Sequence, residues 1–289
     1  MKFSVIIPTY HDWERLQKCL KALHGQSFPK GDYEVIVVNN SESAEIPEHI
    51  ELPNEIQVLH ESRPGSYVAR NKGVSVAKGD LLAFTDSDCI PDEHWLANAA
   101  IYFKQFNCDL LGGRVDIFKG PESGKYGYIY ERNTAFPQHK HVPNGRGVTA
   151  NLFVKKDVFT SVGGFNDEIK SGGDWEFTIK CTENGYSMIY GDDVLVLHPA
   201  RNVSTILKKQ LRLTCGGVLN VKEKYGHGYL RMLGSHIIHG LRKRREYIQK
   251  PDIREKIVVF FIDLLNYIYR AAIHSGIALR LIKPERVRE

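Results

Sequence analysis

The first hundred residues repeat one pattern: a short apolar run, a polar turn, and then a segment with helical spacing. Apolar runs of this length, bounded by turn residues, are typical of strands. Parallel strands are joined by crossover connections, which are usually helices. A segment with helical spacing lies between the first and second runs, and another lies between the third and fourth. The pattern predicts an α/β fold with a mixed, mostly parallel, Rossmann-like sheet flanked by helices. The predicted strands cover 4–7, 33–38, 56–59 and 81–84, and the predicted helices about 13–25 and 67–78.

Length and cysteine content narrow the class of protein. With 289 residues, 42% of them hydrophobic, the chain can bury a substantial core, which argues against a disordered or disulfide-stapled mini-protein. Its five cysteines are odd in number and form no CxxC pair, which favours a reducing compartment. The apolar stretch before Pro8 is too short for a secretory signal. We therefore expect a cytoplasmic protein.

Charge is distributed unevenly along the chain. Residues 1–200 hold 20 Lys and Arg against 27 Asp and Glu, whereas residues 201–289 hold 19 against 7, including the basic run 242–245. A basic segment of this kind favours an anionic partner such as a phospholipid surface or nucleic acid. Because it carries no helix-turn-helix, zinc-finger or RNA-binding signature, we do not expect nucleic acid as a partner.

Pro8, Asn39 and Asp86 follow the first, second and fourth predicted strands. In open α/β sheets, ligands bind just beyond the carboxyl ends of strands, so these positions are candidates for one site. Asp86 and Asp88 can reach a cation from a single turn, and carboxylate oxygens suit Mg²⁺ or Mn²⁺. On its own, the Asp-Ser-Asp sequence is more often a solvated turn.

A series of motifs in the first 200 residues resembles the inverting family 2 glycosyltransferases, which have the GT-A fold and a DxD motif. Each motif is degenerate, but their order along the chain is specific. The matching segments are 5–10, 34–41, 64–73, 79–88, 149–159, 162–165, 173–176 and 198–199.

The resemblance implies an enzyme that transfers a sugar from a nucleoside diphosphate sugar to a saccharide or lipid-linked saccharide, as in surface polysaccharide or glycolipid assembly. It implies a nucleotide-sugar-binding half over 1–100 and an acceptor-binding, catalytic half over 101–200. Residues 201–289 would form a basic, amphipathic helical extension.

The resemblance also assigns a divalent metal, Mn²⁺ or Mg²⁺, to Asp86, Asp88 and His198. Asp88 would hold the ion, and Asp86 would assist through the ribose or a metal-bound water. His198 matches a histidine that joins the metal in many relatives, and an imidazole ligand shifts the expectation towards Mn²⁺. Outside this series, His198 would be an ordinary surface or core histidine.

Asp174 corresponds to the general base that deprotonates the acceptor hydroxyl. The family usually has Glu-Asp at this point, whereas this chain has Gly173 before the aspartate. Trp175 and Glu176 are candidate acceptor-binding residues. Alternatively, Trp175 packs in the core and Glu176 is a structural carboxylate at the start of a helix.

The resemblance also implies that Pro8, Thr9, Tyr10 and Asn39 recognise the nucleotide. The family commonly has Asp at the Asn39 position, and an amide oxygen can still accept a hydrogen bond from the base. Uridine is favoured by its frequency in the family. Arg70 is expected to contact the diphosphate or the donor sugar, with a surface ion pair as the alternative.

The rest of the chain gives coarser expectations. Residues 120–147 are polar and aromatic and are predicted to be a loop that acts as a lid or binds substrate. An amphipathic helix is predicted over 257–282, in which Asp263 and Arg270 argue against a membrane span. This helix either packs on protein, including a second copy in a homo-oligomer, or holds the enzyme peripherally on the cytoplasmic face of an anionic membrane.

Two other functions are open to a chain of this composition. A nucleotidyltransferase that makes nucleotide sugars would have a Gly-rich phosphate loop after the first strand, but residues 8–12 read Pro-Thr-Tyr-His-Asp. A non-catalytic basic protein that binds membrane or nucleic acid would use only the last third of the chain.

Overall fold

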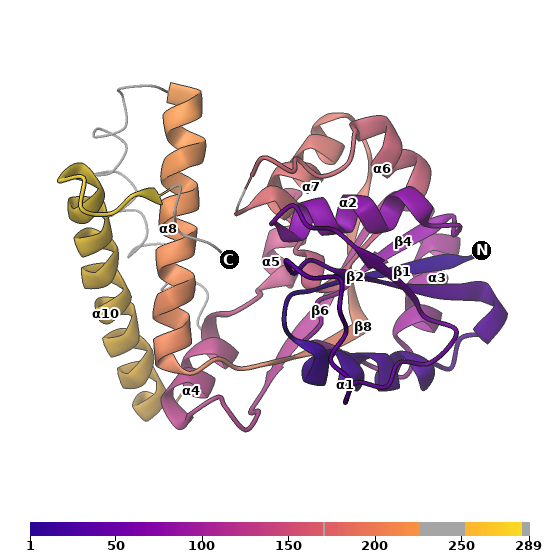
Figure 1. Cartoon of the computed structure of the whole chain (residues 1–289), viewed down its shortest axis with the longest axis horizontal. Helices are drawn as coiled ribbons and strands as arrows, with labels where there is room; N and C mark the ends of the chain where they lie inside the picture. The colour runs from indigo at the N-terminus through magenta and orange to yellow at the C-terminus, as the bar shows by residue number, and fades with distance from the viewer. Residues whose placement is uncertain (170, 226–251, 285–289) are drawn as a thin grey trace. The chain divides into compact units, whose positions relative to one another are not determined.

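The computed structural model describes residues 1–169, 171–225 and 252–284 (Figure 1). These residues form two compact units, which are treated separately below. The first unit comprises 1–116, 136–168 and 172–198; the second consists mainly of 117–135, 199–225 and 252–284.

An eight-stranded sheet is the framework of the first unit, with the strand order β3-β2-β1-β4-β7-β6-β8-β5. Strands β1 to β4 pair in parallel, and β7 pairs antiparallel with β4 and β6. The sheet confirms the predicted fold class. The strands are β1 (Phe3–Thr9), β2 (Tyr33–Asn39), β3 (Gln57–His60), β4 (Leu81–Phe84), β5 (Ile90–Pro91), β6 (Leu110–Phe118), β7 (Leu152–Lys155) and β8 (Met188–Pro199).

The register of the parallel strands brings their carboxyl ends to one edge of the sheet. Thr9 pairs with Asn39 across β1 and β2, and Ile6 pairs with Phe84 across β1 and β4. Residues that follow β1, β2 and β4 therefore emerge together, and Asp86 is among them.

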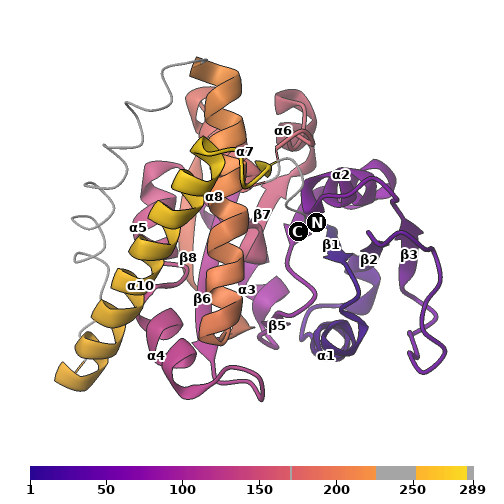
Figure 2. The same ribbon diagram turned by 60° about the vertical axis from the view of Figure 1, so that its left-hand side comes forward.

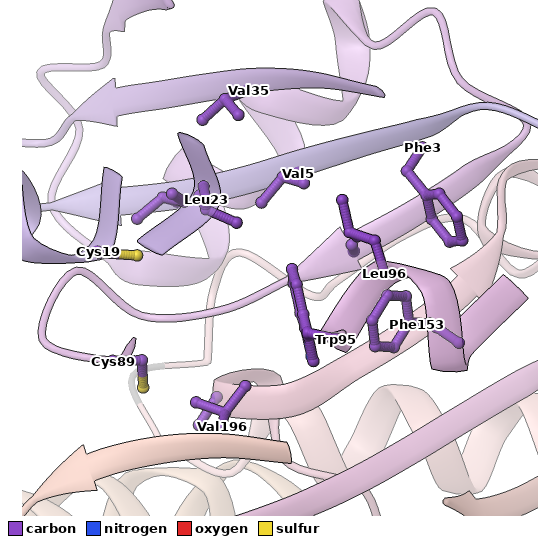
Figure 3. Close-up of a cluster of buried hydrophobic side chains, with 14 of the residues drawn as sticks. Phe3, Val5, Cys19, Leu23, Val35, Cys89, Trp95, Leu96, Phe153 and Val196 are labelled. Atoms are coloured by element: carbon purple, nitrogen blue, oxygen red, sulfur yellow. The ribbon is translucent and has the colours of Figure 1, made fainter. Parts of the chain in front are cut away.

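Helices cover both faces of this sheet (Figure 1). The side chains of β1 alternate between the faces, as the pleat requires, so Val5 belongs to one core and Ile6 to the other. Figure 3 shows the first core, which includes Trp95 and Phe153. Full burial of each large apolar side chain stabilises the fold by about 1.5–3 kcal/mol. The helices are α1 (Trp13–His24) and α3 (Trp95–Phe106) on the first core, and α2 (Ser66–Val76), α6 (Lys156–Val162) and α7 (Gly173–Glu183) on the second.

The prediction of a loop over 120–147 is wrong. This stretch contains α4 (Lys125–Thr134), α5 (Gln138–His141) and the 3₁₀ turn η2 (Val142–Asn144). Tertiary contacts in the second unit hold α4: the Tyr130 hydroxyl donates to Oδ1 of Asp263 at 2.9 Å. Polar and aromatic residues that are typical of loops are here buried partners of another helix.

The second unit is built from α4, α8 (Val203–Tyr225) and α10 (Ile253–Ala278), and Figure 2 shows α8 beside α10. Residues 117–135, which the sequence places with the catalytic half, belong to this unit because α4 packs on both helices. The helix predicted over 257–282 is present and begins at Ile253. The basic run 242–245 lies outside the described residues.

The side of α10 that packs within the second unit combines the apolar Val259 and Ile262 with polar residues. Asp263 and Asn266 both hydrogen-bond to the hydroxyl of Tyr130. By length and composition, the segment Ile253–Ile277 could cross a membrane, with a mean hydropathy of 1.4. Its exposed apolar face consists of Ile253, Ile257, Phe260, Phe261, Leu264, Leu265 and Ile268.

Candidate active site

Four potential metal ligands gather beyond the carboxyl end of β4. Ligand atoms of Asp86, Asp88, Cys89 and His198 all lie within 4.8 Å of one another. His198 is buried near the end of β8, with its Nε2 3.6 Å from Oδ2 of Asp88. Burial, with the negative charges of Asp88 and Asp86, raises the pKa of the Cys89 thiol well above its ordinary value. Thiolate is also a softer ligand than Mn²⁺ and Mg²⁺ prefer. The remaining carboxylate and imidazole donors fit Mn²⁺ or Mg²⁺.

Residues 86–88 form an acidic turn after β4. Asp12 and Arg15, at the start of α1, contact this turn, and neither residue was predicted. The Ser87 hydroxyl donates to Oδ2 of Asp12 at 2.8 Å, and Nε of Arg15 donates to Oδ1 of Asp12 at 2.5 Å. Arg15 also lies 3.9 Å from Oδ2 of Asp88. Burial raises the pKa of Asp12, which its hydrogen bonds to Arg15 and Ser87 oppose. Their position in the sequence could have indicated a role in the site: they follow β1, and ligands of open α/β sheets bind beyond the carboxyl ends of the strands.

Arg70 lies on α2 and is only 3% exposed. Its Nη2 donates to Oδ1 of Asp86 at 2.5 Å, so the ion pair is partly buried: the arginine is enclosed and the carboxylate is partly exposed. Its Nε is also buried and has no hydrogen-bond partner among the residues that the structure describes. A buried donor without a partner is costly, and a bound anionic group would satisfy it.

Asp174 lies in the first turn of α7, beside the elements that carry the acidic turn. Its Oδ1 accepts hydrogen bonds from the Tyr67 hydroxyl at 3.3 Å and the Trp175 amide at 2.9 Å. Burial raises the pKa of this carboxyl, the positive charge of Arg70 lowers it, and the negative charge of Asp86 raises it. The predicted base and the predicted acidic turn are therefore close enough to interact electrostatically.

Tyr67 connects these groups, and sequence reasoning missed it. Its ring lies 5.9 Å from the guanidinium carbon of Arg70, so contacts run from Asp174 through Tyr67 and Arg70 to Asp86. A Cβ at Gly173 would lie 2.8 Å from the Tyr67 ring. The space that the family's usual glutamate would enter is thus occupied by Tyr67, which explains the glycine at this position.

Trp175 and Glu176 follow the base on α7, and both are half-buried. Trp175 belongs to none of the hydrophobic cores of the described residues. Its ring forms a T-shaped pair with His141, with ring centroids 5.0 Å apart, and the guanidinium carbon of Arg146 lies 5.4 Å from its centroid. Glu176 lies in the first turn of the helix, where a negative charge is favourable. Acceptor binding by these two residues stays a prediction.

The predicted nucleotide-binding residues lie at the ends of β1 and β2. Tyr10 is exposed and Pro8 is half-buried, whereas Thr9 is buried and its hydroxyl has no partner within the described part of the chain. Asn39 is buried, and its Oδ1 accepts from both the amide and the hydroxyl of Ser41. These two bonds fill the acceptor capacity of the amide oxygen. In this arrangement Asn39 orders the turn after β2, and direct contact with a base stays a prediction.

Sequence comparisons show which known proteins this chain is similar to. The family model described as glycosyl transferase family 2 matches residues 4–163. Glycosyltransferase AglE of Haloferax volcanii is 39% identical over 222 residues, which cover 74% of this chain and 72% of that protein. A Methanococcus voltae protein named dolichyl N-acetyl-alpha-D-glucosaminyl phosphate 3-beta-D-2,3-diacetamido-2,3-dideoxy-beta-D-glucuronosyltransferase is 22% identical, with 82% of each chain covered.

A solved structure shows the same fold. It is the mannosyltransferase PcManGT from Pyrobaculum calidifontis in complex with GDP-Man and Mn²⁺. The TM-score is 0.55 at 18% identity, and the match covers 99% of this chain and 82% of that one.

Proposed function

Because the chain belongs to glycosyl transferase family 2, we propose that it transfers a sugar, with inversion, from a nucleoside diphosphate sugar to a saccharide or lipid-linked saccharide. One observation carries the proposal: a run of contacts links Asp174 to Asp86 through Tyr67 and Arg70. Inversion needs a base on one side of the anomeric carbon and a stabilised leaving group on the other. This site offers groups for both tasks.

Leaving-group stabilisation falls to the acidic turn and Arg70. Asp88 and His198 would hold Mn²⁺ or Mg²⁺, with Asp86 as a further oxygen ligand, and such an ion neutralises the charge of a departing diphosphate. The buried Nε of Arg70 supplies a donor for a phosphate or donor-sugar oxygen. Support for the metal comes from the donor set and from the Mn²⁺ in the mannosyltransferase of the same fold.

Asp174 would take the proton from the acceptor hydroxyl. A carboxylate whose pKa is raised by burial is a stronger base than an exposed one, which helps proton transfer near neutral pH. The Methanococcus voltae relative is named for a dolichyl-phosphate-linked sugar, which supports a lipid-linked acceptor, as in glycolipid or surface polysaccharide assembly. We propose UDP as the first nucleotide to test, with GDP as its competitor.

The apolar face of α10 supports a peripheral location on the cytoplasmic face of the membrane. Phe260 and Phe261 are 58% and 61% exposed, and Arg254 and Lys256 lie at the same end of the helix. Apolar side chains beside cations fit an anionic lipid surface. The protein should co-sediment with phosphatidylglycerol liposomes at low salt, and Phe261→Asp should weaken this binding. Binding only to a second copy of the chain would contradict the proposal.

The proposed reaction is tested by incubating the full chain with a panel of nucleotide sugars, with and without Mn²⁺. We expect release of nucleoside diphosphate that requires the metal and is lost in Asp88→Ala and Asp174→Ala, while both variants remain folded by circular dichroism. A nucleotidyltransferase would instead release pyrophosphate from a nucleoside triphosphate and a sugar phosphate. A protein that only binds would release nothing from any donor.

A further inference from the structure

Arg146 is held over the face of Trp175, next to the proposed base. Its guanidinium carbon lies 5.4 Å from the centroid of the indole ring, a cation–π arrangement. Within the described ranges, no carboxylate forms an ion pair with Arg146. The stacked cation therefore keeps its hydrogen-bond donors available to a ligand.

The backbone around Arg146 is built to keep it there. The amide of Arg146 donates to the carbonyl of His141 at 3.1 Å, which closes the turn over η2. The same turn sets the ring of His141 edge-on against Trp175, with 5.0 Å between the ring centroids.

Glycines on both sides of Arg146 dock the turn onto neighbouring elements. A Cβ at Gly145, which has a φ of +71°, would meet Oγ1 of Thr182 at 2.6 Å, and one at Gly147 would meet Cε of Met188 at 2.5 Å. The amide of Gly147 donates to Oγ1 of Thr178 at 3.1 Å, and Thr178 in turn donates to the carbonyl of Asp174. Arg146 is thus fixed relative to the helix that carries the base.

We propose that Arg146, stacked on Trp175, binds an anionic group of the acceptor, a carboxylate or a phosphate on the saccharide. This inference rests on the proposed function, because it takes the side of Asp174 as the acceptor side. A guanidinium matches carboxylate and phosphate oxygens in geometry and charge. Arg146 therefore selects an acidic or phosphorylated acceptor over a neutral one.

The experiment measures binding by titration calorimetry with the full chain in the presence of UDP and Mn²⁺. Three probes are compared: methyl β-D-glucuronide, glucose 6-phosphate and the neutral methyl β-D-glucoside. We expect at least one anionic probe to bind tenfold or more tightly than the glucoside. Arg146→Gln should abolish this preference and leave UDP affinity within twofold. Arg146→Lys, which keeps the charge but loses the planar guanidinium, should keep only part of this preference.

The matched control is Lys104→Gln, which removes one exposed positive charge from α3 and should change nothing. Equal binding of the three probes by the wild type overturns the inference, as does a preference in Arg146→Gln as large as that of the wild type. Loss of UDP affinity in Arg146→Gln overturns it as well, because the residue would then serve the donor. A preference for the neutral sugar, with normal donor turnover, overturns this inference alone. Failure to turn over any donor overturns the proposed function.

Discussion

The hydroxyl of Tyr67 donates a hydrogen bond to Oδ1 of Asp174 across 3.3 Å. The same tyrosine ring fills the space beside residue 173, where a Cβ would come within 2.8 Å of it. One side chain thus orients the proposed base and replaces the bulk of the glutamate that the family usually places before it. Tyr67 is buried, and burial together with the negative charge of Asp174 raises the pKa of its phenol, so it remains a neutral donor.

Tyr67→Phe should lower turnover and move its pH dependence. The hydrogen bond from Tyr67 lowers the pKa of Asp174, so its loss raises that pKa further. A base acts in its ionised form, and the acid limb of the pH–rate profile should therefore shift to higher pH. We expect kcat/KM to fall roughly tenfold near neutral pH. An unchanged profile would show that Tyr67 only fills space, and Tyr33→Phe, at a hydroxyl bonded to the Leu23 carbonyl, is the control.

Asp174→Asn should be inactive yet more stable than the wild type at pH 7. Burial raises the pKa of Asp174 above its ordinary value of 3.8, so the folded state holds this proton more tightly than the unfolded chain. The free energy of unfolding therefore falls as pH rises above 3.8, until the carboxyl is ionised in both states. An amide removes this cost and can still accept the bonds from Tyr67 and Trp175.

Thermal unfolding at several pH values and turnover together check this prediction. We expect turnover to drop by roughly 10²- to 10⁴-fold, the range of general base catalysis. The variant's higher Tm at pH 7 should converge with the wild-type value as pH falls towards 4. A lower Tm at pH 7 would mean that the charged carboxylate is stabilising in the fold.

The sequence predicts the sheet, and the edge at which Thr9, Asn39 and Asp86 emerge, because both follow from the local pattern of apolar runs and turns. Short apolar runs give the strands, and a register of parallel strands then carries Thr9, Asn39 and Asp86 to one edge. Contacts between distant segments were not predictable in this way. The burial of Arg70 and the stacking of Arg146 on Trp175 depend on three-dimensional packing, which no local periodicity records.

Because a local pattern does not record contacts with other residues, the sequence also failed to predict the helix α4 and the hydrogen bonds of Asn39. α4 has a polar, aromatic sequence with weak local helical signal, and Tyr130 gains its partners only from α10. Asn39 was assigned to base recognition from its position, but position does not show that Ser41 already occupies its amide oxygen.

Asp88→Asn should remove stabilisation by Mn²⁺. Binding to the folded state alone raises the free energy of unfolding by about 2.7 kcal/mol when the ion is at 100 times its Kd. The wild type should therefore show a higher Tm with Mn²⁺, and chelation should reverse it. Asp88→Asn should lose the shift, whereas Glu183→Gln, which removes an exposed carboxylate on α7, should retain it. A shift of equal size in Asp88→Asn would place the metal elsewhere.

Gly79→Ala should destabilise the fold by displacing β1, the strand that ends at Thr9. A Cβ at Gly79 would lie 2.7 Å from backbone atoms of Phe3 and Ser4, and backbone cannot move aside as a flexible side chain can. The Gly79 amide also donates to the Ser4 hydroxyl at 2.8 Å, so displacing it loses a buried hydrogen bond. We expect the free energy of unfolding to fall by roughly 1–3 kcal/mol, seen as a Tm lower by several degrees.

Gly31→Ala is the matched control, since no atom beyond its chain neighbours lies within 4 Å of the added Cβ. This variant should be neutral or slightly stabilising. Equal Tm values for the two variants would show that β1 can shift to accept the methyl group.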